Sequence, residues 1–268
     1  MTYEIISSAK NIKRGEFGVI YGLEGCGKTT LTSFFNNSIY IQTKECGLRE
    51  IDAPCYPATA DFSDLMGQLR DVFKRRTAKD DNDFNFNNLI IDTGSSIEQM
   101  IYADVFATEK LSDGSHADAL EQYGWNRGYE LVQKRWMKVV SACKAIADTG
   151  MNVVMIFHAS VQKFKTPLGQ EYNYYNIDIT HREGVSSRDF VTRNAEFVLF
   201  INIETVSVKK KIGATTKEVA ASNSVTPDHI IYCEKRSGFN AKNRHSLDFK
   251  YDYTLNNPPV DMIEKIGL

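Results

Sequence analysis

The sequence predicts an α/β fold with a mostly parallel central sheet flanked by helices. Three observations carry this prediction: apolar runs of strand length recur along the chain, helical patterns separate them, and a glycine-rich loop follows the first run. Strands that alternate with helices pair in parallel through right-handed crossovers. A chain of 268 residues is also long enough to bury its core without disulfides or a metal.

The strands are predicted from short apolar runs, of which the first is 17–21 and the last is 229–233. The four runs between them are continuous rather than alternating, as in strands buried on both faces of a parallel sheet: 39–41, 89–91, 153–157 and 197–203. Apolar residues at helical spacing predict helices over 62–76, 96–108 and 125–148, and a short helix at 29–35. No Pro/Gly/Ser-rich linker divides the chain. We therefore predict a single domain over 1–268, with its core at about 15–250, a β-rich elaboration after residue 158 and a hairpin insertion at about 203–228.

Composition narrows the class of protein. The five cysteines contain no C-x-x-C pair, so a disulfide framework and a structural zinc site are both poor interpretations. The net charge of −2 argues against a basic coat for duplex DNA, but neither requires nor excludes a nucleic-acid partner. No apolar run approaches the roughly 20 residues of a membrane span, and the polar residues 1–14 lack an apolar signal core. We expect a cytoplasmic protein with no membrane partner.

A phosphate-binding loop follows the first predicted strand. The stretch matches the Walker A pattern G-x-x-x-x-G-K-[ST], and its residues are Gly22, Leu23, Glu24, Gly25, Cys26, Gly27, Lys28, Thr29 and Thr30. Glycines let the backbone curl so that its N–H groups point at phosphate oxygens, and the following helix favours the same anion. The pattern places the lysine on the β- and γ-phosphates of a nucleotide such as ATP.

A magnesium site is predicted beside this loop. The Thr29 hydroxyl of a Walker A loop ligates Mg²⁺. The run 89–91 ends in Asp92, which is the Walker B arrangement of an apolar strand followed by an acid. Because ligands of an open α/β sheet sit at the carboxyl ends of its strands, we expect Asp92 to lie next to the loop.

Other motifs separate the branches of phosphate-loop proteins. The sequence has no N-K-x-D base reader of GTPases, no transporter signature before the Walker B strand and no Arg-rich lid of small-molecule kinases. What remains resembles the RecA-like ATPases. The resemblance implies that Glu45, which follows the second strand, polarises the attacking water, and that His158, at the end of the run 153–157, senses the γ-phosphate. A solvated loop acid and a structural histidine are the alternatives.

The resemblance extends to one group within this class. The stretches 122–128, 150–158, 167–172, 195–198 and 241–244, in this order, resemble bacteriophage RecA-like nucleotide-binding proteins, the Sak-type ATPases of single-strand annealing recombination. The similarity spans roughly residues 15–250 and departs at Glu196, where the group has Asp. It implies a RecA-like P-loop NTPase fold, a host-cytoplasmic location, and single-stranded DNA as a partner.

The same resemblance implies a DNA-binding stretch at 160–193. Cations interleaved with aromatic rings suit a flexible single strand, and the candidates are Lys163, Lys165, Tyr172, Tyr175 and Arg182. Acidic residues in the same stretch weaken this interpretation, and tyrosines of a hairpin can instead pack on the sheet. Lys209–Lys211 lies in a predicted hairpin, where it either protects an edge or contacts phosphates.

RecA-like ATPases usually complete their site with a cation from a neighbouring subunit. Lys242 and Arg244 are the candidates, with Lys235 and Arg236 as the fallback and ordinary surface charge as the alternative. We therefore expect a homo-oligomer with the ATP site at a subunit interface, and a phage single-strand-binding protein is a further candidate partner. The predicted function is DNA-stimulated ATP hydrolysis in recombination or annealing. A RecA-fold helicase or DNA-packaging motor, and a nucleotide-gated binding module with incidental hydrolysis, are the alternatives.

Overall fold

The computed structural model describes most of the chain. The described residues are 14–44, 47–48, 51–78, 83–165, 169, 171–203, 206–212, 215–221, 229–254 and 256–268. For 164–165, 206–212 and 215–221 only the backbone is described.

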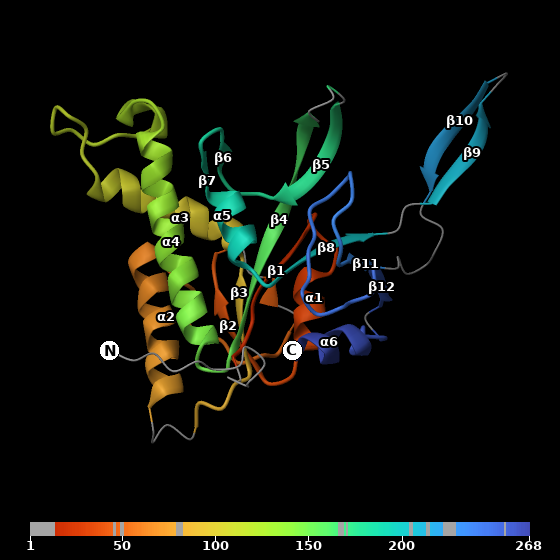
Figure 1. The fold of residues 1–268 in the computed structure, drawn as a ribbon, viewed down its shortest axis with the longest axis horizontal. Helices are drawn as coiled ribbons and strands as arrows, with labels where there is room; N and C mark the ends of the chain where they lie inside the picture. The colour runs from red at the N-terminus through yellow and green to blue at the C-terminus, as the bar shows by residue number, and fades with distance from the viewer. Residues whose placement is uncertain are drawn as a thin grey trace, which may run out of the picture.

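The centre of the molecule is an eight-stranded sheet (Figure 1). Five strands run parallel in the order β8-β1-β4-β3-β2: Phe197–Ile203, Phe17–Gly22, Asn152–Lys165, Asn88–Asp92 and Ser38–Gln42. Beyond β8, the sheet continues with the antiparallel strands β11 (His229–Tyr232) and β12 (Lys250–Tyr253). The eighth strand, β5 (Glu171–Ile177), pairs antiparallel with the second half of β4. The Walker A strand β1 and the Walker B strand β3 are therefore separated by β4.

Helices cover both faces of this sheet. One face packs against α2 (Phe62–Thr77), α3 (Gly94–Thr108), α4 (Arg127–Ala147) and α5 (Ser187–Asn194). The other face packs against α1 (Lys28–Ser33) and α6 (Val260–Ile266). In Figure 1, α2, α3 and α4 lie on one side of the strands, and α1 and α6 lie on the other. The core is divided by the sheet into two apolar clusters, as a three-layer α/β fold requires.

The predicted α/β architecture is confirmed, and the differences from it have local causes. The strand predicted at 153–157 continues to Lys165, because β5 supplies hydrogen-bonding partners from Ala159 onward. The helix predicted from residue 125 begins at Arg127, since Trp125 has φ 44° and cannot belong to a right-handed helix. Strand β12 and helices α5 and α6 were not predicted. They are short, and their stabilising contacts come from distant parts of the chain.

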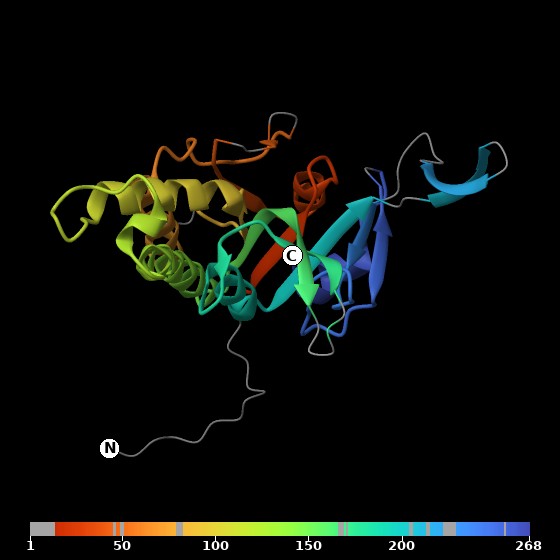
Figure 2. The ribbon, with the colours of Figure 1, turned by 90° about the horizontal axis from the view of Figure 1, so that it is seen from above.

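Small elements complete the fold. A 3₁₀ helix spans Leu120–Tyr123, and a short hairpin joins β6 (His181–Arg182) to β7 (Val185–Ser186). Strands β9 (Val206–Ile212) and β10 (Thr215–Ala221) form their own antiparallel pair, which stands away from the main sheet in both views (Figure 2). The single-domain division stays a prediction. Among the described residues, no helix has the length and apolar character needed to traverse a membrane.

Candidate functional site

The Walker A loop begins where β1 ends. Every residue of β1 is buried, and its final glycine packs so closely on β8 that a Cβ there would lie 2.4 Å from the Ile201 carbonyl oxygen. Gly25 has φ 69° and Gly27 has φ 82°, which is the left-handed region that favours glycine. The glycines at these positions of the motif thus meet requirements of the backbone itself.

Lys28 is held inside the loop. Its Nζ donates hydrogen bonds to the carbonyl oxygens of Gly22 (3.0 Å) and Leu23 (2.6 Å), and the residue is only 7% exposed. Burial lowers the pKa of the ammonium, and the charges of Cys26 and Asp92 oppose this shift. Among the described residues, its only other hydrogen-bond partner is the Cys26 sulfur at 3.9 Å, and an ammonium held mainly by neutral carbonyls is poorly compensated. The Lys28 ammonium can therefore gain favourable interaction energy by binding phosphate oxygens.

Thr29 and Asp92 meet beside this lysine. The Thr29 hydroxyl donates to Asp92 Oδ2 over 2.9 Å, and the Gly47 amide donates to the same oxygen over 3.4 Å. Asp92 is 2% exposed, and burial raises the pKa of its carboxyl, against the hydrogen bonds from Thr29 and Gly47. A hydroxyl and a carboxylate at hydrogen-bonding distance are the oxygen donors that Mg²⁺ uses, with water filling its other positions. The donor set therefore fits Mg²⁺, with Thr29 and Asp92 as the residues that would hold it.

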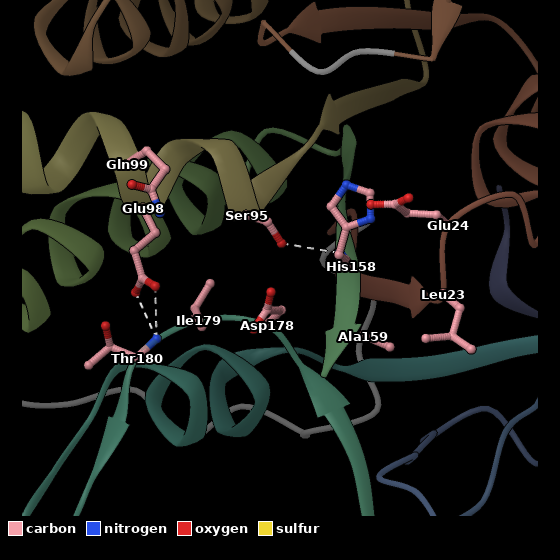
Figure 3. A pocket seen from close by; sticks show the side chains of 10 residues that line it. All are labelled: Leu23, Glu24, Ser95, Glu98, Gln99, His158, Ala159, Asp178, Ile179 and Thr180. Atoms are coloured by element: carbon pink, nitrogen blue, oxygen red, sulfur yellow. Dashed lines mark hydrogen bonds between the residues drawn. The ribbon is translucent and has the colours of Figure 1, made fainter. Parts of the chain in front are cut away.

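A cavity of about 1100 Å³ opens in front of the loop (Figure 3). His158 and Glu24 both line it, and His158 lies level with Gly22 in the parallel β1–β4 pair. The backbone N–H of His158 donates to Ser95 Oγ over 3.1 Å, which ties β4 to the start of α3. The cavity therefore lies at the carboxyl ends of the strands, where open α/β sheets bind ligands.

Glu98 forms the far wall of this cavity and was not found from the sequence. Its two carboxylate oxygens accept from the Thr180 amide at 2.8 and 2.9 Å (Figure 3). Its Oε1 also accepts from Trp136 Nε1 at 3.3 Å. Burial raises the pKa of this carboxyl, opposed by these hydrogen bonds. Glu98 thus fastens α3 to the chain that follows β5. Its only signal in the sequence is its place six residues after the Walker B acid, on the helix that follows the Walker B strand.

Tyr253 contacts the Walker A loop at Gly27 and was also not predicted from the sequence. Its hydroxyl donates to the Gly27 carbonyl oxygen over 2.9 Å, and its ring stacks on His229 at a centroid distance of 5.0 Å. A Cβ on Gly27 would come within 2.6 Å of this hydroxyl. The contact joins the two ends of the chain, so no local pattern could have indicated it.

The predicted water-polarising residue, Glu45, lies outside the described residues, and its role stays a prediction. The chain just before it is well anchored. The Thr43 amide and hydroxyl both donate to the Asp92 carbonyl oxygen, at 2.8 and 3.1 Å, and Thr43 Oγ1 accepts from the Thr93 amide at 2.9 Å. The end of β2 is thus bonded directly to the end of the Walker B strand.

Lys242 and Arg244 lie far from the loop of their own chain. Lys242 pairs by its backbone with Val198, near the start of β8, whereas the loop lies level with the end of that strand. Its Nζ donates to the Arg193 carbonyl oxygen over 3.0 Å. Arg244 forms an ion pair with Glu196, the position at which the sequence departs from its resemblance. Within one subunit, neither cation can contact a nucleotide on this loop.

The predicted DNA-binding residues are divided by the structure. Lys163 is exposed on the β4–β5 hairpin, the side chain of Lys165 is not described, and Tyr172 packs edge-on against Tyr174 at 6.3 Å. Tyr175 stacks on Phe200 of the core at 5.2 Å, which favours the packing role that the sequence left open. The Arg182 guanidinium lies over the Tyr129 ring at 4.6 Å and donates to its hydroxyl.

Comparisons with known proteins give one family match and several similar solved structures. The sequence profile of a family described as AAA domain matches residues 14–245. The chain belongs to this AAA domain family. No curated protein matches it. Similar solved structures include a KaiC-like protein of the hyperthermophilic archaeon Pyrococcus horikoshii, 12% identical, with a TM-score of 0.45 and coverage of 91% of this chain and 88% of that one. The flagellar accessory protein FlaH of Methanocaldococcus jannaschii is 11% identical, with a TM-score of 0.40 and coverage of 91% and 87%.

The fold of this AAA domain is that of a RecA-like P-loop NTPase. The strand order and the Walker A loop between β1 and α1 are the features that define it. Together with the family, they support ATP binding and hydrolysis. The two archaeal proteins are too distant to indicate a substrate or a partner for this chain.

Proposed function

We propose that this AAA domain hydrolyses ATP and acts on single-stranded DNA in recombination or annealing of the phage type. The observation that carries the ATPase part is the 2.9 Å contact between Thr29 Oγ1 and Asp92 Oδ2, next to the buried Lys28. It brings the two predicted metal ligands and the predicted phosphate-binding lysine together.

The residues divide the work of an in-line attack of water on the γ-phosphate. Lys28 exchanges its two carbonyl partners for phosphate oxygens and neutralises charge there. Thr29 and Asp92 would hold Mg²⁺, which would supply further neutralisation of the phosphate charge when bound. Glu45 orients the water, which is worth about 10²–10⁴-fold in rate for a positioned base. His158 faces the same cavity and registers whether the γ-phosphate is present.

The DNA part of the proposal is supported by the course of β4. This strand carries His158 in the cavity and, five residues later, the exposed Lys163 on the β4–β5 hairpin. A continuous strand transmits a displacement better than a loop, because its hydrogen-bonded ladder resists bending. The nucleotide state would thus be passed to a DNA-contacting hairpin over a short, rigid path.

The proposed function predicts that single-stranded DNA stimulates ATP turnover. The measurement is steady-state phosphate release with and without an oligothymidylate at fixed salt, with duplex DNA of equal phosphate content as the control. Lys28→Ala provides the blank for contaminating ATPases. Turnover that no nucleic acid alters would contradict the DNA role and leave the ATPase assignment standing.

We further propose that the active form is a homo-oligomer whose interface brings Lys242 or Arg244 to a neighbour's nucleotide. Two points support this proposal. Within one subunit, Lys242 and Arg244 are bonded to Val198 and Glu196, which precede the part of β8 that lies level with the loop. Hydrolysis also needs added positive charge.

Arg244→Ala is expected to bind ATP normally and to lose at least about tenfold in turnover. In a fully assembled site, an arginine supplied by a neighbouring subunit raises the rate of hydrolysis by about 10³-fold or more. Glu196→Gln is the matched control, because it breaks the same exposed ion pair and keeps the cation. Loss of that pair alone costs at most about 1 kcal/mol. Equal turnover in both variants, and turnover per subunit that is independent of dilution, would rule out the trans role.

A further inference from the structure

A second cavity, of about 530 Å³, lies between the β4–β5 hairpin, α5 and the segment after β11. Its lining includes five cationic residues and one carboxylate, that of Asp189. The cations are Lys163, Arg188, Arg193, Lys235 and Lys242, and we refer to this cavity as the basic pocket. It shares no lining residue with the cavity in front of the Walker A loop. Excess positive charge in a concave site concentrates anions.

Arg188 is the unusual member of the basic pocket. It is 3% exposed, and among the described residues its Nε and Nη1 have no hydrogen-bond partner. The Asp189 carboxylate is 3.9 Å from Nε, beyond hydrogen-bonding distance. Buried donors are nearly always paired, and a buried guanidinium with two unpaired nitrogens costs free energy. An arginine kept in this state is explained by an acceptor that comes from outside the chain.

The fold fixes this arginine in place. Its backbone N–H donates to the Thr180 carbonyl oxygen over 3.2 Å, and its own carbonyl oxygen accepts from the Thr192 hydroxyl over 3.0 Å. Ser186 caps the same helix by accepting from the Asp189 amide at 3.0 Å. The side chain therefore projects from a rigid turn of α5, as a preorganised binding group does.

The neighbouring groups do not neutralise the pocket. Asp189 also lies 3.5 Å from His181 Nδ1. Burial and the nearby Arg188 charge lower the pKa of His181, which keeps its ring neutral near pH 7. Lys242 already donates to the Arg193 carbonyl oxygen, and Lys235 Nζ lies 5.8 Å from the Tyr174 ring centroid. The lysines thus line the opening around the buried guanidinium.

We propose that the basic pocket is a phosphate-binding site, in which the Arg188 guanidinium holds the phosphate and the surrounding lysines neutralise it. A planar guanidinium fork matches two phosphate oxygens, and such charge-assisted bonds are stronger than those between neutral groups. The phosphate comes either from a polynucleotide backbone, which rests on the proposed DNA function, or from a small phosphorylated molecule, which does not.

The test uses the full chain with Lys28→Ala as the background, so that the Walker A loop adds no phosphate signal. Calorimetric titration with inorganic phosphate, against chloride at equal ionic strength, measures binding. Arg188→Met is expected to weaken phosphate binding at least about tenfold, since a charge-assisted hydrogen bond is worth 1.5–3 kcal/mol. Its melting temperature without ligand should be unchanged or higher, because an unpaired buried charge is removed.

Two further variants distinguish a specific loss of phosphate binding from a folding defect. The double variant Lys163→Ala/Lys235→Ala changes two exposed side chains of the basic pocket and should also weaken phosphate binding. Lys138 is an exposed cation of α4 outside the pocket, so Lys138→Ala should leave phosphate binding unchanged. Unaltered phosphate affinity in both pocket variants would overturn the proposal. So would a large fall in the melting temperature of Arg188→Met with phosphate binding intact in Lys163→Ala/Lys235→Ala.

Competition identifies the source of the phosphate. If oligothymidylate displaces inorganic phosphate and itself binds Arg188→Met more weakly, the ligand is a polynucleotide backbone. If phosphate binds through Arg188 and oligothymidylate does not compete, the ligand is a small phosphorylated molecule. In the second case the pocket stands although the proposed DNA function fails, so the two failures are distinguishable.

Discussion

Lys28→Ala should lose at least about a thousandfold in ATP turnover, together with most of its affinity for ATP. The ammonium is the one cation of the Walker A loop, and it is held 2.6–3.0 Å from two backbone carbonyl oxygens, ready to exchange them for phosphate oxygens. Its removal leaves the negative charge of the transition state without a fixed partner in a partly dry site. Phosphate release and calorimetric ATP titration measure the two losses.

The fold should survive this change. Burial already lowers the pKa of the Lys28 ammonium, so the charged form gains little from its folded surroundings. Lys44→Ala is the matched control, since Lys44 is an exposed cation at the end of β2, close to the same strand ends. Turnover that falls equally in both variants, or that persists in Lys28→Ala, would contradict the assignment of the phosphate-binding lysine.

The sequence was sufficient to locate the Walker A loop because the pattern that defines this loop is local. A short run of glycines followed by a lysine and a threonine defines the loop, and the left-handed φ angles of Gly25 and Gly27 show why glycine is favoured at those positions. Asp92 could be added because parallel strands end at one edge of the sheet. The contact between Thr29 and Asp92 was thus predictable from the sequence, and their role as metal ligands stays a prediction.

Contacts between distant segments were beyond that reasoning. Tyr253 supports Gly27 from 226 positions away, and Glu98 binds the Thr180 amide over 82 positions. Neither residue has a local pattern that distinguishes it from an ordinary core tyrosine or helix acid. The basic pocket is similar, since β4, α5 and the segment after β11 supply its cations and only the folded chain brings them together.

The second large effect is expected for Asp92→Asn, which should lose about a hundredfold or more in Mg²⁺-dependent turnover. The amide keeps the shape of the carboxylate but removes the charge that would hold the metal. Half-maximal turnover should also require more Mg²⁺. Turnover measured across a Mg²⁺ titration tests both statements, and wild-type rates at every Mg²⁺ concentration would contradict the metal role.

The same substitution should change how stability depends on pH. Burial raises the pKa of Asp92 above its ordinary value of 3.8, so the folded chain holds this proton more tightly than the unfolded chain does. Stability therefore falls as pH rises from 3.8 through the raised pKa, because the folded state must then carry a buried charge. Asn has no such proton. The melting temperature of ligand-free Asp92→Asn should exceed that of the wild type above this window and approach it below.

Thr29→Val separates the two effects, because it removes the hydroxyl ligand at nearly constant volume and leaves the carboxylate in place. Its Mg²⁺-dependent turnover should fall as in Asp92→Asn. Its stability, however, should keep the fall with rising pH, and the fall should extend to higher pH, since the hydrogen bond from Thr29 holds the Asp92 pKa down. A pH profile of melting temperature that is flat in Thr29→Val would show that Asp92 is not the buried charge responsible. Activity and stability therefore report on the same carboxylate independently.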